Sequence, residues 1–100
     1  MENPVAFNEI RIIVAGTRTF SNYELLKGKL DDFISELNQK HPGKQIVIIT
    51  GAAKGADQLG SFYARNHNIP LKEFPADWTT YGKAAGPIRN QQMLDYALHE

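Results

Sequence analysis

The chain has 100 residues, and its length and composition fit one small globular domain. Its 11 basic and 11 acidic residues give a formal net charge of +0, which argues against a general nucleic-acid binder but allows a local basic site. Cysteine is absent, so a disulfide scaffold, a thiolate zinc site and a cysteine nucleophile are excluded. The sequence contains no apolar run of membrane-spanning length, and residues 1–8 lack the pattern of a signal peptide, so we expect a soluble, cytoplasmic protein.

The first half of the chain alternates apolar runs with an amphipathic segment. Residues 10–15 form a continuous β-branched run, which predicts a strand buried on both faces, and residues 45–50 predict a second one. Between them, Ser21 or Asn22 can cap a helix over about residues 23–38. The spacing of its apolar residues predicts one buried face, made of Leu26, Leu30, Phe33, Ile34 and Leu37.

The second half continues the alternation. A helix is predicted over about residues 56–67, ended by Asn68 in a left-handed conformation, and a short strand over residues 71–74. A long loop is expected from Pro75 to Gly86, and Pro87 fits the first turn of a last helix. The apolar side chains expected to be buried are Leu59, Phe62 and Tyr63 in the earlier helix and Ile88, Met93, Leu94, Ala97 and Leu98 in the last one.

This order of elements predicts an α/β fold. Strands that alternate with helices form a parallel sheet covered by helices, and right-handed crossovers give a three-layer, Rossmann-like domain with strand order 3-2-1. Three strands are few for this architecture, and the chain stops on a helix where a fourth strand would normally follow. We therefore expect residues 1–100 to be a single domain that is truncated, or one that completes its sheet through its open edge with another chain, as in a homo-oligomer.

Three loops are expected at the carboxyl ends of the strands, where open parallel sheets bind ligands. They cover residues 16–20, 51–57 and 75–89. Their cations are Arg18, Lys54, Lys83 and Arg89, and their acids are Asp57 and Asp77. A cationic mouth on a neutral protein is thus predicted, which suits a phosphate or a carboxylate ligand.

The middle loop carries the sharpest signal. Its small residues allow a ligand to approach the backbone, and the helix that follows offers free N–H groups to an anion, beside Lys54. It matches neither the Walker A pattern, which needs Gly-Lys-Ser/Thr, nor Gly-x-Gly-x-x-Gly. The alternative is that the glycines only form a tight turn.

The side chains of the other two loops each have two interpretations. Arg18, between Thr17 and Thr19, can grip a phosphate or remain an exposed arginine beside a capping segment. Trp78 and Tyr81 can stack on a base or pin the loop, and for Trp78 we favour pinning. Arg89 is expected in the first turn of a helix, where a cation opposes the dipole, so it suggests an external anion; a salt bridge to Asp57 or Asp77 is the alternative.

Asp57 is expected to cap its helix, with a ribose acceptor or a catalytic carboxylate as its other possible roles. The three histidines show no ligand spacing, so no metal and no cofactor is expected. The predicted ligand-binding residues are Gly16, Thr17, Arg18, Thr19, Gly51, Ala52, Lys54, Gly55, Asp57, Tyr81, Lys83 and Arg89.

Four ordered motifs together resemble the YspA-like branch of the SLOG superfamily, the Rossmann-like group that contains the DNA-processing protein DprA and the LOG phosphoribohydrolases. The motifs are VAGTRTF (14–20), TGAAKGAD (50–57), FPADW (74–78) and YGKAAGPIRN (81–90), and the resemblance spans about residues 10–98. The family pattern usually has a second glycine where this chain has Ala52, a replacement that matters little if φ is negative there.

The resemblance implies binding of a nucleotide or nucleotide-derived ligand, as in a sensor domain. An N-glycosidase similar to the LOG enzymes is the first alternative, but their Gly-Gly-x-Gly-Thr-x-x-Glu pattern is not met, and Asp57 would have to replace the glutamate. Single-stranded nucleic-acid binding, as in DprA, is the second alternative, disfavoured by the neutral charge. The expected partner is a nucleotide-like small molecule, with nucleic acid disfavoured and no membrane.

Overall fold

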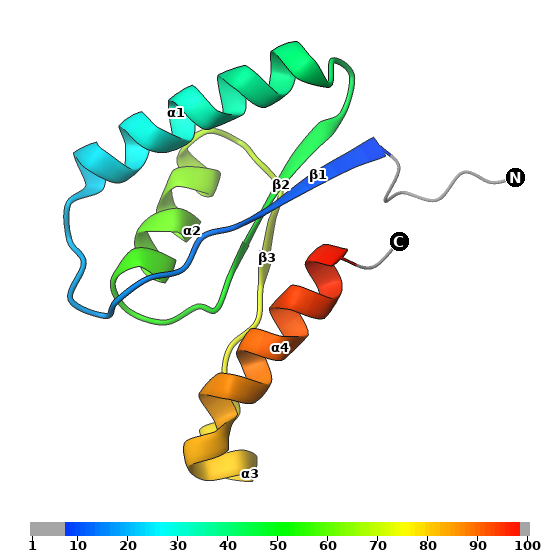
Figure 1. Cartoon of the computed structure of the whole chain (residues 1–100). Helices are drawn as coiled ribbons and strands as arrows, with labels where there is room; N and C mark the ends of the chain where they lie inside the picture. Colours follow the sequence, from blue (N-terminus) through cyan, green and yellow to red (C-terminus); the bar gives the residue numbers. More distant parts are fainter. Residues whose placement is uncertain (1–7, 99–100) are drawn as a thin grey trace, which may run out of the picture.

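A three-stranded parallel sheet organises the computed structural model of the chain, which describes residues 8–98 (Figure 1). The strands are β1 (Glu9–Ile13), β2 (Gln45–Thr50) and β3 (Leu71–Glu73), and β2 lies in the middle. Both pairs are parallel, with Ile12 beside Ile48 and Ile48 beside Leu71. The predicted Rossmann-like α/β fold and strand order are confirmed.

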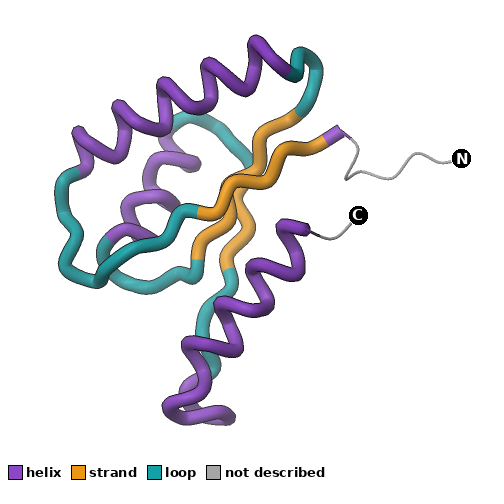
Figure 2. The backbone as a smooth tube through the Cα atoms, in the orientation of Figure 1, coloured by secondary structure: helices purple, strands orange, loops and turns teal. Residues whose placement is uncertain are grey.

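Helices cover both faces of this sheet. The helices α1 (Tyr23–Lys40) and α2 (Ala56–Asn66) lie on one face, and α4 (Ala85–Leu98) lies on the other (Figure 2). The central strand is consequently shielded on both sides, and its last three residues are 0% exposed. This explains why the sequence of β2 is a continuous apolar run rather than an alternating one.

Two asparagines act at the helix ends as predicted. The side chain of Asn22 caps α1, because its Oδ1 accepts the N–H of Leu25 at 3.0 Å. Asn68 follows the end of α2 with a φ of 55°, in the left-handed region that ends a helix.

Small residues let α2 lie close to the sheet. A Cβ placed on Gly60 would come within 2.7 Å of Val14, and Ala64 is 0% exposed. One large side chain on this helix, Tyr63, is also buried, and its hydroxyl donates to Asp31 of α1 at 2.6 Å. Lys27 donates to the other oxygen of Asp31 at 2.7 Å, and these two hydrogen bonds hold the pKa of Asp31 below its ordinary value.

Four side chains that were expected in the core are exposed instead: Phe33, Phe62, Leu94 and Leu98, with exposed fractions of 46%, 49%, 45% and 74%. The ring of Phe62 rests edge-on against Tyr23, with 5.1 Å between centroids. Strands lie about 4.8 Å apart, so three of them form a sheet too narrow to cover the flanks of its helices. The helical spacing identified the inward faces correctly, but it overestimated their width.

The segment from Pro75 to Gly86 is more ordered than expected. A short helix, α3 (Trp78–Tyr81), begins at Asp77, whose side chain accepts the N–H of Thr80 at 3.1 Å. Hydrogen bonds from Thr80 lower the pKa of Asp77. A 3-10 turn over Gly82–Ala84 then leads directly into α4. The prediction of an irregular loop is therefore wrong, whereas Pro87 does lie in the first turn of α4.

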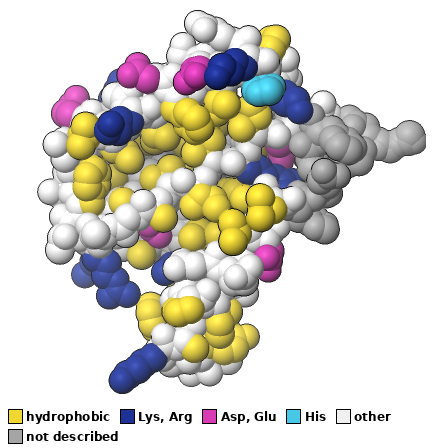
Figure 3. Space-filling model, in the orientation of Figure 1, with side chains coloured by type: hydrophobic (Ala, Val, Ile, Leu, Met, Phe, Trp, Pro, Cys, Tyr) yellow, Lys and Arg dark blue, Asp and Glu magenta, His cyan; other side chains and the backbone are white. Residues whose placement is uncertain are grey.

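The outer edge of β1 pairs with no strand among residues 8–98. An apolar groove of about 310 Å³ lies between this strand and α1, and Leu26 and Phe33 are among its lining residues. Hydrophobic side chains gather on the face of the molecule seen in Figure 3. Pairing of this edge with a second chain stays a prediction. In the part of the chain that the structure describes, no helix has the length and apolar character needed to cross a membrane.

Candidate functional site

A cavity of about 330 Å³, here called the strand-end pocket, lies at the carboxyl ends of the strands. All three predicted loops contribute to it. Its lining residues are Arg18, Gly51, Ala52, Ala53, Lys54, Pro75, Ala76, Trp78 and Arg89. A cavity therefore lies at the end of the sheet where open parallel sheets bind ligands, and its use as a binding site stays a prediction.

The loop after β1 is fastened to the start of α2. The carbonyl of Thr17 accepts the N–H groups of Phe20 at 3.3 Å and of Ala56 at 3.2 Å. Gly16 lies so close to α2 that a Cβ there would come within 2.8 Å of the Cβ of Ala56. The hydroxyl oxygens of Thr17 and Thr19 are 3.4 Å apart and exposed, and neither threonine lines the pocket. This loop therefore supports the site and places only Arg18 in its wall.

The backbone of Gly51 is held on both sides of its Cα. Its N–H donates to Oδ2 of Asp57 at 3.0 Å, and its carbonyl accepts from Nη1 of Arg89 at 2.6 Å. A Cβ at Gly51 would collide with both of these side chains, so the close approach requires glycine. Asp57 is only 5% exposed, and it does not line the pocket.

Two expectations about these side chains are wrong, and so is one alternative, the ion pair of Arg89. The cap residue of α2 is Gly55, and no side chain among the described residues caps this helix, so Asp57 holds the loop rather than the helix end. Within residues 8–98, Arg89 forms no ion pair with Asp57 or Asp77. Arg89 also lies just past the first turn of α4, because the helix begins at Ala85.

The middle loop bends through two left-handed residues. Ala52 has a φ of 58° and Gly55 a φ of 78°. The condition under which an alanine in place of the family glycine matters little, a negative φ, is therefore not met. An L-residue in this conformation costs about 1–2 kcal/mol, so the loop carries strain at Ala52.

The strand-end pocket has an excess of positive charge. Among residues 8–98, Arg18, Lys54 and Arg89 line it, and no carboxylate does. The acids of the same loops are engaged with backbone N–H groups: Asp57 with that of Gly51 and Asp77 with that of Thr80. None of the three cations forms an ion pair in the described part of the chain. The pocket is thus suited to an anion.

The aromatic wall of the pocket is Trp78, for which pinning of the loop was favoured over stacking on a base. Trp78 is 48% exposed, and the guanidinium carbon of Arg18 lies 5.8 Å from the centre of its ring. Tyr81 and Lys83, which were expected at the site, do not line the pocket. The short helix α3 decides this arrangement, because it fixes where Trp78 and Tyr81 project.

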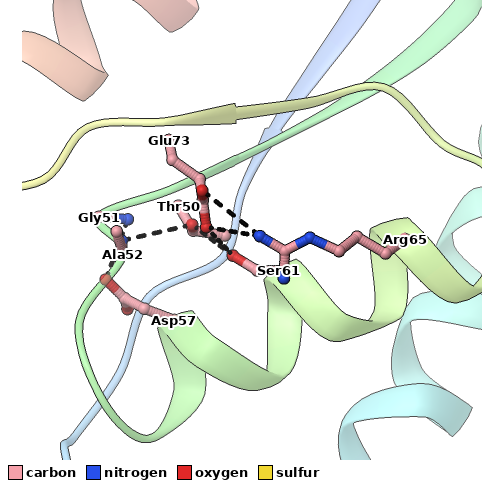
Figure 4. Close-up of polar contacts among 7 residues, drawn as sticks. All are labelled: Thr50, Gly51, Ala52, Asp57, Ser61, Arg65 and Glu73. Atoms are coloured by element: carbon pink, nitrogen blue, oxygen red, sulfur yellow. Dashed lines mark hydrogen bonds and ion pairs between the residues drawn. The ribbon is translucent and has the colours of Figure 1, made fainter.

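A second cavity of about 260 Å³, here called the side pocket, adjoins the first. Residues 52–54 line both cavities, and Gln58, Ser61, Arg65 and Glu73 complete the side pocket. Figure 4 shows the side chains of Thr50, Ser61, Arg65 and Glu73 meeting beside the loop. No motif in the sequence pointed to this cluster, although Glu73 ends β3 and therefore lies at the same edge of the sheet.

Metal ligands do not gather in the described residues. Among residues 8–98 there is no group of three or more His, Cys, Asp or Glu side chains that could hold a metal ion.

Comparison with known proteins gives the family. The chain is 29% identical to the Gene 61 protein of Mycobacterium phage D29 over 89 residues, which cover 84% of this chain and 67% of the phage protein. No solved structure matches the chain. The model of the YspA, cpYpsA-related SLOG family matches residues 10–81, which include β1, the middle loop and α3. The chain therefore belongs to the YspA, cpYpsA-related SLOG family.

Proposed function

We propose that the strand-end pocket binds a nucleotide or a nucleotide-derived small molecule through its phosphate. The observation that carries this proposal is the set of three cations, Arg18, Lys54 and Arg89, around a cavity that no carboxylate of the described residues lines. Hydrogen bonds from Arg or Lys to phosphate oxygens are about twice as strong as neutral ones, so these cations would supply much of the affinity.

The remaining wall suits the rest of such a ligand. Half-exposed Trp78 offers a ring face on which a base can stack. Arg89 uses Nη1 and Nε in hydrogen bonds to Gly51 and Asn90, so in the described residues its Nη2 keeps its donors for a ligand. A module of this kind would serve as a sensor of its ligand. Catalysis is not part of the proposal, because the carboxylate of Asp57 is buried and already accepts the N–H of Gly51.

The proposal is tested by titration calorimetry with AMP, adenosine and inorganic phosphate. We expect AMP to bind more tightly than either fragment. Arg18→Ala and Lys54→Ala should each weaken AMP binding by about tenfold or more, because a hydrogen bond to a charged group contributes about 1.5–3 kcal/mol.

The matched control is Lys44→Ala, which removes an exposed cation from the turn before β2. It should leave the Kd for AMP unchanged. The proposal fails if AMP does not bind, if neither pocket variant weakens binding, or if Lys44→Ala weakens it as much as they do.

A further inference from the structure

The side pocket differs in charge from the strand-end pocket. Lys54 lines both cavities, but the side pocket also contains the carboxylate of Glu73. Arg65 lies 3.4 Å from that carboxylate, so the two charges largely balance each other. A phosphate in the side pocket would face a carboxylate, whereas a neutral group that donates hydrogen bonds would not be repelled.

The carboxylate of Glu73 is held in place and yet open. Its Oε2 accepts from the hydroxyl of Ser61 at 2.8 Å, and Ser61 is only 2% exposed. The side chain of Glu73 is 34% exposed. A carboxylate has about four acceptor positions, so Glu73 can still accept hydrogen bonds from a ligand.

The direction of the hydrogen bonds behind Glu73 follows from this acceptor. Ser61 has one hydroxyl proton, and it is donated to the carboxylate. Oγ1 of Thr50 lies 2.9 Å from Oγ of Ser61, so the hydroxyl of Thr50 must donate its proton to Oγ of Ser61. Oγ1 of Thr50 then accepts the N–H of Ala52 at 3.4 Å. This series of hydrogen bonds links the carboxylate of Glu73 to residues 52–54, which form the ridge between the two cavities. Every donor in the series points toward Glu73.

We propose that the side pocket binds the sugar hydroxyl groups of the ligand, with the carboxylate of Glu73 as their acceptor. This inference rests on the proposed function, because it places the phosphate of the same molecule in the strand-end pocket, across the ridge formed by residues 52–54. It makes the site selective for ribonucleotides over nucleotides that lack the 2′- and 3′-hydroxyl groups, and it makes Glu73 the residue that determines this selectivity.

The test compares AMP, 2′-deoxy-AMP and 2′,3′-dideoxy-AMP by calorimetry on the unaltered chain, and then on Glu73→Gln. We expect the unaltered chain to bind AMP at least about tenfold more tightly than the dideoxy compound, the value for a charged hydrogen bond. Glu73→Gln should weaken AMP binding toward that of the dideoxy compound and leave the dideoxy compound unaffected. Glu36→Gln, an exposed glutamate on α1, is the control and should change nothing.

Each contrary result has a distinct meaning. Equal affinity of the unaltered chain for AMP and dideoxy-AMP overturns this inference and leaves the proposed function standing. If Glu73→Gln weakens both compounds equally, the residue acts by holding the loop, and the inference is again wrong. If none of the three nucleotides binds, the proposed function fails together with the inference.

Discussion

The strain at Ala52 gives a prediction in which the effect of backbone conformation on stability is measured separately from the effect of side-chain contacts. Ala52 has a φ of 58°, whereas its neighbour Ala53 is not among the described residues with positive φ. Ala52→Gly relieves about 1–2 kcal/mol of left-handed strain but adds about 0.4–1 kcal/mol of freedom to the unfolded chain. The free energy of unfolding should therefore rise by about 0.8 kcal/mol, the centre of a range of roughly 0–1.6 kcal/mol.

Ala53→Gly is the matched control, because it makes the same chemical change on the same loop without relieving strain. It should lower the free energy of unfolding by about 0.4–1 kcal/mol. The two variants should thus differ by about 1–2 kcal/mol, or by roughly 4–16 °C in Tm for a domain of this size.

The assay is urea unfolding followed by fluorescence of Trp78, the only tryptophan in the chain. Both variants should have the m-value of the unaltered protein, so that a change in midpoint reports a change in stability. Equal destabilisation by the two substitutions would refute the argument, because it would mean that Ala52 carries no strain.

The remaining predictions concern the helices and are checked by the same urea assay. Gly28→Ala on α1 should stabilise the protein by about 1 kcal/mol, since nothing lies within 4 Å of the added Cβ. Gly60→Ala on α2 should destabilise it by about 1–3 kcal/mol, because the Cβ would lie 2.7 Å from Val14; stabilisation by both alanines would contradict the close packing of α2. Tyr63→Phe should destabilise at pH 7, because it removes a hydrogen bond that helps to lower the pKa of Asp31. That contribution exists above the ordinary aspartate pKa of about 4 and is lost as the pH falls through the lower folded value, so the difference from the unaltered protein should shrink in acid; a difference that stays constant down to pH 2 would show that Asp31 is not involved.

Much of the fold was predictable because local chemistry decides it. The β-branched runs of the sheet and the capping side chain of Asn22 act within a few residues of sequence, and each produced the expected element. The exposed flanks of the helices were not predictable in the same way. Whether Phe33 is buried depends on the width of the sheet beneath it, which is a property of the whole assembly of strands.

The cavity at the strand ends was predictable in location but not in detail. Glycine-rich loops after parallel strands pointed to this edge of the sheet, and Arg18, Lys54 and Arg89 do line one cavity there. The roles of Asp57 and Trp78 depend on contacts between segments far apart in the chain. Asp57 finds the amide of Gly51, and Trp78 projects from a short helix that the proline- and glycine-containing sequence did not suggest.

The two hydrogen bonds that hold Gly51, one to Asp57 and one from Arg89, have a consequence for how this domain unfolds locally. Asp57 comes from the helix on one face of the sheet and Arg89 from the helix on the other, and both hold the backbone of Gly51, the residue that follows β2. Detachment of either helix would break one of these two hydrogen bonds. The helices on opposite faces of the sheet, α2 and α4, should therefore detach together rather than one at a time. The amide hydrogen of Gly51 is the reporter of this event. Its exchange with deuterium should be as slow as that of the β2 core, and in Arg89→Ala it should quicken along with the amides of α2.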